Sequence, residues 1–67
     1  MDTLYTQREA AVALRLSEPT LKRLRVEGRG PKYIKLNRSV RYRQSDLDEW
    51  IAGRVVRSTS EAVGVVR

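Results

Sequence analysis

The stretch "RLSEPTLKRLRVEGRGPKYIKLNRSVRYR", residues 15–43, decides how this chain folds. Ten of its residues are Lys or Arg and two are Glu, a local charge of +8, whereas the rest of the chain holds four positive and six negative residues. Apolar side chains recur between these charges at regular spacings, which a solvated tail would not need. The stretch therefore predicts a folded surface with a concentrated positive patch, and such a patch favours a polyanionic partner.

The first half of the stretch predicts a short basic helix. Ser17 is a favourable N-cap, and Pro19 falls in the first turn, where its missing amide costs no hydrogen bond. The helix is expected to run from Glu18 to Glu27. Gly28 is expected to end it by taking the left-handed conformation.

The two faces of this helix differ in chemistry. At about 100° per residue, Leu21 and Leu24 point one way, and the opposite face is basic. A recognition helix presents such a face to a DNA major groove, where cations bind guanine or phosphate and apolar groups contact thymine methyls. The contacts expected from the helix and its amino end are Ser17, Glu18, Pro19, Thr20, Lys22, Arg23 and Val26, with Arg15, Arg25 and Lys32 expected on the DNA backbone.

The second half predicts a β-hairpin, because residues 33–36 and 40–43 both alternate apolar and polar side chains. Asn37, Arg38 and Ser39 are expected to form its turn, with Asn37 at positive φ. The alternation predicts an apolar side with Ile34, Leu36, Val40 and Tyr42, and a polar side with Tyr33, Lys35, Arg41 and Arg43.

The hairpin is interpreted as a wing. A narrow minor groove is negative enough to attract an inserted arginine, and Arg38 at the tip is the candidate. Lys35 and Arg41 are expected on the flanking phosphates, the alternative being edge-strand charges that only prevent aggregation. The expected wing contacts are Lys35, Asn37, Arg38, Ser39 and Arg41.

A first helix is expected before the stretch. Residues 6–9, "TQRE", fit a capping box, so the helix would begin after Thr6 and end near Leu14 or Arg15. Leu4 and Tyr5 precede it as apolar anchors. Its alanines would allow another helix to approach closely.

A third helix is expected over residues 46–52, capped by Ser45. Leu47, Trp50 and Ile51 form one apolar stripe, so Trp50 is interpreted as a core anchor rather than a base-stacking residue. The acidic residues of this helix favour its positive amino end, and without other ligands they make a poor metal site.

The composition excludes several classes of protein. The chain has no Cys and no His, which removes disulfides, thiolate metal sites and the commonest general base. We expect no enzyme, no cofactor, no metal and no small-molecule ligand, because no nucleophile–base pair is visible. With no membrane span or secretory signal, a cytoplasmic, nucleoid-associated protein is expected. Residues 1–53 are expected to form one domain, followed by a flexible or partner-ordered tail over residues 54–67.

The motifs together resemble a known family. They are "EAA" at residues 9–11, Ser-x-x-Thr-Leu at 17–21, "EGRGP" at 27–31 and "SDLDEWI" at 45–51. In this order they resemble the small winged helix-turn-helix domains of the excisionase type, within the MerR-like superfamily, with AlpA-like prophage regulators as close relatives. The resemblance implies a mainly α fold with a small β-hairpin, and DNA binding by the second helix and the wing. Many relatives have glycine where Asn37 stands.

The resemblance also implies a function. Excisionases, or recombination directionality factors, bind double-stranded DNA beside phage attachment sites, bend it and recruit an integrase to excise the prophage. Several copies are expected on neighbouring sites, associated head to tail. One alternative is a small prophage transcriptional regulator that binds promoter DNA with the same residues. Another is a protein-interaction module whose basic face docks an acidic partner.

Overall fold

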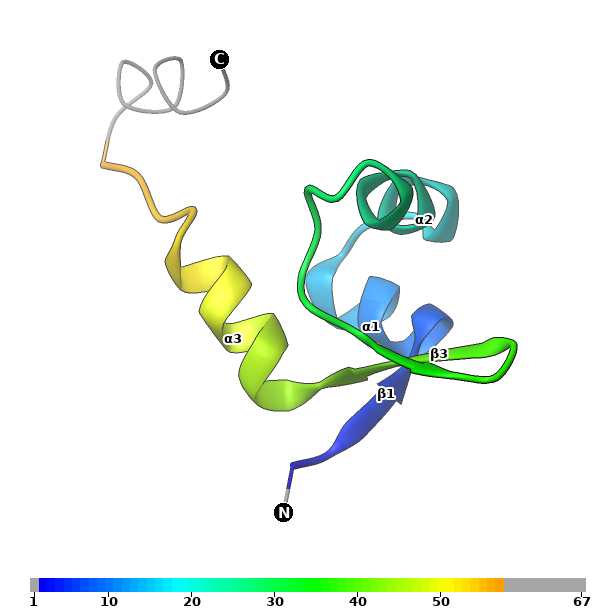
Figure 1. Ribbon diagram of the computed structural model, residues 1–67. Coiled ribbons are helices and arrows are strands. Elements are labelled where there is room, and N and C mark those ends of the chain that lie inside the picture. The colour runs from blue at the N-terminus through cyan, green and yellow to red at the C-terminus, as the bar shows by residue number, and fades with distance from the viewer. Residues whose placement is uncertain (1, 58–67) are drawn as a thin grey trace.

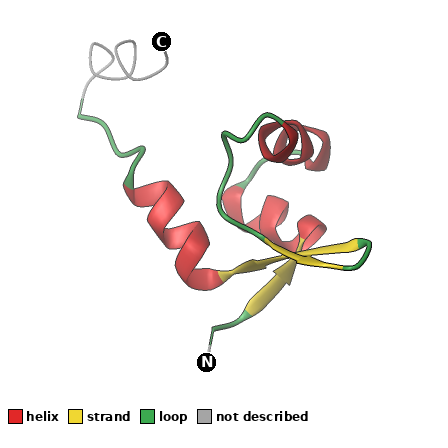
Figure 2. Cartoon of the chain, in the orientation of Figure 1, coloured by secondary structure: helices red, strands yellow, loops and turns green. Residues whose placement is uncertain are grey.

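The structure is a computed structural model, and residues 2–57 of the chain are described. Three helices and three strands follow one another within this part of the chain (Figure 2). In chain order they are β1 (Leu4–Thr6), α1 (Gln7–Leu14), α2 (Glu18–Val26), β2 (Ile34–Leu36), β3 (Ser39–Arg43) and α3 (Gln44–Ala52). Of the expected tail, residues 58–67 lie outside the described residues.

Helix α1 begins and ends as its sequence predicts. Thr6 Oγ1 accepts a hydrogen bond from the Glu9 amide at 3.1 Å, and the Glu9 carboxylate accepts one from the Thr6 amide at 2.9 Å, which completes the capping box. Arg15 takes a left-handed conformation, with φ 57°, and ends the helix. The Leu16 amide then donates to the Ala11 carbonyl at 2.9 Å, so the chain turns sharply toward α2.

Helix α2 also has the predicted ends. Ser17 Oγ accepts from the Thr20 amide at 3.2 Å, and Pro19 lies in the first turn. Gly28 follows the helix with φ +72°, a conformation that costs an L-residue energy. The helix-turn-helix geometry of α1 and α2 therefore follows from local capping chemistry.

The sheet contains a strand that was not predicted. Its order is β1-β3-β2, and β1 pairs antiparallel with β3 through Leu4–Arg43, Tyr5–Tyr42 and Thr6–Arg41. Helices α1 and α2 lie on one side of the sheet, and α3 leaves directly from the end of β3 (Figure 1). The residues expected only as anchors before α1 thus extend the wing into a three-stranded sheet.

The hairpin register differs from the expectation. Leu36 pairs with Ser39, so the turn holds only Asn37 and Arg38, not Ser39 as well. Lys35 then pairs with Val40 and Ile34 with Arg41, and paired residues point to the same face of a sheet. Because removing one turn residue exchanges the faces of one strand relative to the other, the predicted all-apolar and all-polar sides were wrong. The positive φ of Asn37, 55°, is confirmed.

The core lies between the sheet and the helices. Its fully buried members, on α1, α2, β3 and α3, are Ala10, Ala11, Leu21, Tyr42 and Leu47, and Tyr5, Leu14 and Val40 pack against them. The two alanines let α1 approach its neighbours closely. A short chain buries only a small core, so its stability also depends on contacts outside the core, such as those around α3.

The amino end of α3 is held differently from the prediction. The helix begins at Gln44, and Ser45 is not its N-cap. The Ser45 amide and hydroxyl instead donate to the Asp2 carboxylate at 3.3 and 3.1 Å. Arg43, which precedes the helix, forms a bidentate ion pair with the buried Asp46, with N–O distances of 2.7 and 3.0 Å.

Trp50 is not the core anchor that was expected. Its indole is half-buried, and Nε1 donates to the Arg29 carbonyl at 3.0 Å. The Arg54 guanidinium lies 4.2 Å from the Trp50 ring centroid and donates to the same carbonyl at 3.1 Å. These three residues, called here the Trp50–Arg29–Arg54 contact, hold α3 against the loop that follows α2.

Candidate DNA interface

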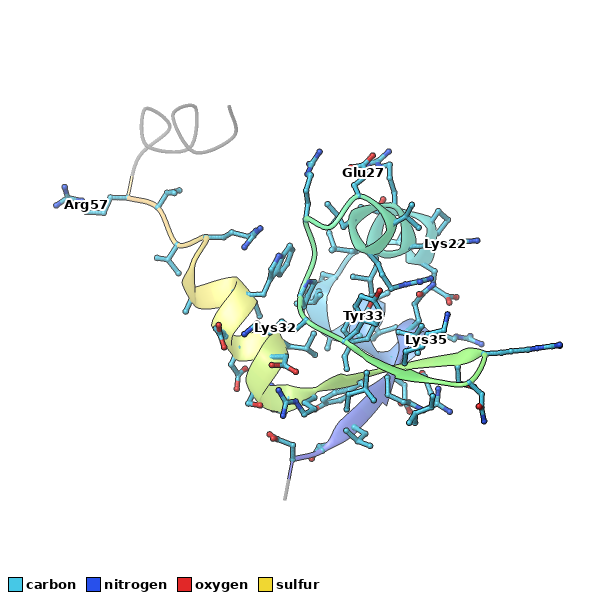
Figure 3. All side chains as sticks on the ribbon, viewed as in Figure 1. Lys22, Glu27, Lys32, Tyr33, Lys35 and Arg57 are labelled. Carbon is cyan, nitrogen blue, oxygen red and sulfur yellow. The ribbon has the colours of Figure 1, made fainter. Side chains whose placement is uncertain are left out.

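The outward face of α2 carries the side chains predicted for it. Pro19, Lys22, Arg23 and Val26 are all exposed, and Val26 retains 72% of its accessible surface. Lys22 points out from α2, away from the body of the molecule (Figure 3). A helix that leaves a valine in water among free cations has the chemistry of a surface that meets base edges and phosphates.

The amino end of α2 adds hydroxyl groups to this face. The Ser17 hydroxyl donates to Thr20 Oγ1 at 2.7 Å, while Ser17 Oγ accepts from the Thr20 amide. Ser17 and Glu18 are exposed, and Thr20 is half-buried. Ser17 and Thr20 therefore form one hydrogen-bonded cap beside the basic face.

The wing tip presents Asn37, Arg38 and Ser39, and all three side chains are exposed. Within residues 2–57, Lys22, Arg23 and Arg38 take no part in the ion pairs that other basic residues form with Glu27, Glu49 and Asp46. No acidic partner has to be displaced from these cations before they bind a phosphate.

Lys35 and Arg41 do not lie together, contrary to the prediction. Because Lys35 pairs with Val40, it lies on the face of the sheet that carries α1 and α2 (Figure 3). Arg41 lies on the opposite face, half-buried, and its Nη1 donates to the Val40 carbonyl at 2.9 Å. The structure therefore brings Lys35, but not Arg41, to the side of the sheet on which α2 lies.

The three predicted backbone cations have separate surroundings. Lys32 lies 3.8 Å from the Glu49 carboxylate and is directed toward α3 (Figure 3). Arg15 borders an open groove of about 410 Å³ whose other walls include Trp50 and Ile51. Arg25 lies toward the wing, because its guanidinium is 5.7 Å from the Tyr33 ring centroid, while its Nε donates to Gln7 Oε1 at 3.2 Å. It lines one open hollow together with Lys32.

Burial and ion pairing shift the pKa values of Asp46, at the start of α3, and of Tyr42, in the core. The hydrogen bond from Arg43 holds the pKa of Asp46 below its ordinary value, against the opposing effect of burial. Burial raises the pKa of the Tyr42 phenol, and the nearby Arg25 partly offsets the shift. Among residues 2–57, no group lies in hydrogen-bond geometry with the buried Tyr42 hydroxyl, although Arg25 is close enough to lower its pKa. The Arg43–Asp46 pair therefore favours the charged form of Asp46 in the folded chain.

Sequence reasoning missed two residues around this interface. Gln7 orients Arg25 from the start of α1, and Tyr33 packs 6.3 Å, centroid to centroid, from Tyr42. Tyr33 was placed on the polar side of its strand, away from Tyr42. A signal was present, since Asn-Arg alone is long enough for the commonest hairpin turn.

A family profile described as a helix-turn-helix domain matches residues 4–55 of the chain. Among curated proteins, none matches the sequence. Within residues 2–57, no helix has the length and apolar character needed to cross a membrane. That part of the chain also holds no group of three or more His, Cys, Asp or Glu side chains placed to hold a metal ion.

Proposed function

This chain belongs to the helix-turn-helix domain family, a DNA-binding family, and we propose that it acts as a phage or prophage excisionase. In this role it binds double-stranded DNA beside an attachment site and bends it. The bent DNA then lets an integrase join its sites in the geometry of excision. The protein performs no chemistry itself.

One observation carries the DNA-binding part of this proposal: cations without an ion-pair partner among residues 2–57 occupy both the outward face of α2 and the tip of the wing. A helix of this kind fits a major groove, and a tip arginine fits the adjacent minor groove. The contacts proposed are those of the α2 face and its cap, together with Lys35 and the wing tip. Engaging both grooves favours DNA that bends around the protein.

The excisionase role rests on the motif order that resembles that family. Several copies are proposed to bind neighbouring sites head to tail, and an integrase is the proposed protein partner. A promoter-binding regulator would use the same DNA-contacting residues. The two functions therefore differ in where their sites lie and how the sites are arranged.

A footprinting titration tests the proposal. The DNA comprises sites selected from a random pool and the DNA that flanks the gene, at physiological salt. We expect several adjacent sites to fill cooperatively, with periodic hypersensitive positions that mark bending. Arg23→Ala is measured beside the native chain, and it should lose affinity by about 1–3 kcal/mol on the selected site if Arg23 reads a base.

Two other outcomes would overturn the excisionase proposal. A single site or one inverted repeat over a promoter would identify a transcriptional regulator. If no sequence were protected, and if DNA binding did not weaken as the salt concentration rises, the result would instead favour docking of an acidic protein on the basic face.

A further inference from the structure

Tyr33 lies at the junction between the recognition helix and the wing. Its side chain keeps 44% of its accessible surface although it is a large aromatic residue. It comes directly before β2, and its side chain lies near that of Lys35, between α2 and the hairpin (Figure 3). Tyr33 thus lies on a part of the surface between the α2 face and the wing tip, and belongs to neither.

The ring of Tyr33 is held on two sides. The Arg25 guanidinium lies 5.7 Å from its centroid, and the Tyr42 ring lies 6.3 Å away at an interplanar angle of 51°. Arg25 is itself fixed by its hydrogen bond to Gln7. A supported ring loses little conformational entropy on binding, so its free end is suited to a fixed contact.

The hydroxyl of Tyr33 remains available to a ligand. Among residues 2–57, the contacts of Tyr33 are with the two neighbouring side chains through its ring, which leaves its hydroxyl unpaired. Arg25 uses Nε for Gln7. Both residues border an open hollow of about 350 Å³ that Gly28, Gly30, Pro31 and Lys32 complete.

A line of donors therefore connects the two DNA-binding elements. Lys22 and Arg25 are three residues apart on α2 and are neighbours on its surface. Arg25 contacts Tyr33, and the Tyr33 side chain lies near Lys35 (Figure 3). When α2 lies in a major groove and the wing in the adjacent minor groove, the sugar–phosphate strand that separates the grooves must cross this line.

We propose that the Tyr33 hydroxyl donates a hydrogen bond to a DNA backbone phosphate between the major-groove helix and the minor-groove wing, with Arg25 as the residue that positions its ring. This proposal rests on the DNA binding proposed above. Tyrosine hydroxyls are among the groups that bind phosphates in protein–DNA complexes. The contact fixes how far the wing stands from the helix along the DNA.

The test compares the full chain with Tyr33→Phe, which removes only the hydroxyl. On a duplex that carries the selected site, Tyr33→Phe is expected to bind about tenfold more weakly, because a hydrogen bond to a charged phosphate is lost. Its slope of log K against log salt should stay unchanged, since no cation is removed, whereas Lys35→Ala should flatten the slope by about 0.9. Tyr5→Phe is the matched control, because the Tyr5 hydroxyl bonds to Gln44 instead.

A scan with methylphosphonates locates the phosphate. Each duplex carries one neutral linkage. We expect one position that weakens native binding and has little effect on Tyr33→Phe. The same position should lose part of its effect in Arg25→Ala, where the ring is no longer held.

Equal affinity of Tyr33→Phe and the native chain would overturn the proposal, as would a scan in which the variant keeps every native sensitivity. Either result leaves the native footprint in place. Failure of the proposed function differs, because the native chain itself would then protect no DNA.

Discussion

The ion pair between Arg43 and Asp46 links the end of β3 to the start of α3. The hydrogen bond from Arg43 lowers the pKa of Asp46, so the folded chain keeps this carboxylate charged at pH values where the unfolded chain protonates it. The stability that the pair contributes is therefore present above the unfolded-state pKa of about 4. It is lost as pH falls through the lower folded-state pKa.

Asp46→Asn should remove this dependence. We expect the variant to be less stable than the native chain near neutral pH, with a difference that shrinks between about pH 5 and about pH 2. Urea denaturation followed by circular dichroism measures both chains. Asp48→Asn removes the same charge from an exposed position of α3 and should keep the native pH profile. A constant difference between Asp46→Asn and the native chain across this range would refute the role assigned to the pair.

Residue chemistry predicted the helix ends better than it predicted burial. Thr6, Ser17 and Gly28 were identified correctly because their capping contacts are local. Trp50 was misplaced because the spacing of apolar residues along a helix does not show what lies outside the core. In the structure, Arg54 lies over the Trp50 ring, and Trp50 Nε1 donates to the Arg29 carbonyl. Ser45 was misassigned as a cap because its actual partner, Asp2, is distant in sequence.

At the scale of elements, the stop after α2 depends on Gly28. Gly28→Ala should destabilise the fold by about 1 kcal/mol, because an L-residue is strained at φ +72° although nothing lies within 4 Å of the added Cβ. Gly53→Ala is the matched control: this glycine also follows a helix, but its φ is −72° and its Cβ would meet atoms at 3.7 Å. Urea denaturation should leave that control near native stability. Equal losses in both variants would show that φ is not the cause.

The sheet shows where prediction of elements stopped. Alternation identified the two wing strands, but the turn length sets their register, and the stretch from Asn37 to Ser39 admits two lengths. Strand β1 is too short to show a period of its own. It forms because it pairs with the edge of β3, whose residues lie more than 30 positions further along the chain. The residues of β1 alone therefore do not predict it. The separation of Lys35 from Arg41 across the sheet follows from the same register.

At the scale of the molecule, DNA binding should depend on salt through a small set of cations. If Lys22, Arg23, Lys35 and Arg38 each contact a phosphate, log K should fall against log salt with a slope of about −4. Alanine at any one of them should flatten the slope by about 0.9, unless that side chain binds a base instead. Mobility-shift assays across a salt series measure this.

Arg8 provides the charge-matched control for this series. It is exposed on α1, outside the predicted contacts, and borders a surface formed with Tyr5 and Val12. Arg8→Ala also lowers the net charge by one, yet it should leave the slope at its native value. If Arg8→Ala flattened the slope as much as the other alanine variants, net charge alone, rather than the α2 and wing surface, would govern DNA binding.

The Trp50–Arg29–Arg54 contact gives the protein a built-in optical reporter. Trp50 is the one tryptophan among all 67 residues, so its fluorescence comes from a single known place. Its indole lies against a guanidinium and a carbonyl that release it when α3 leaves the loop after α2. Emission therefore follows the docking of α3, whereas DNA at the proposed α2 and wing contacts can carry a separate label. A single titration can then show whether DNA binding changes the contact between α3 and the loop after α2.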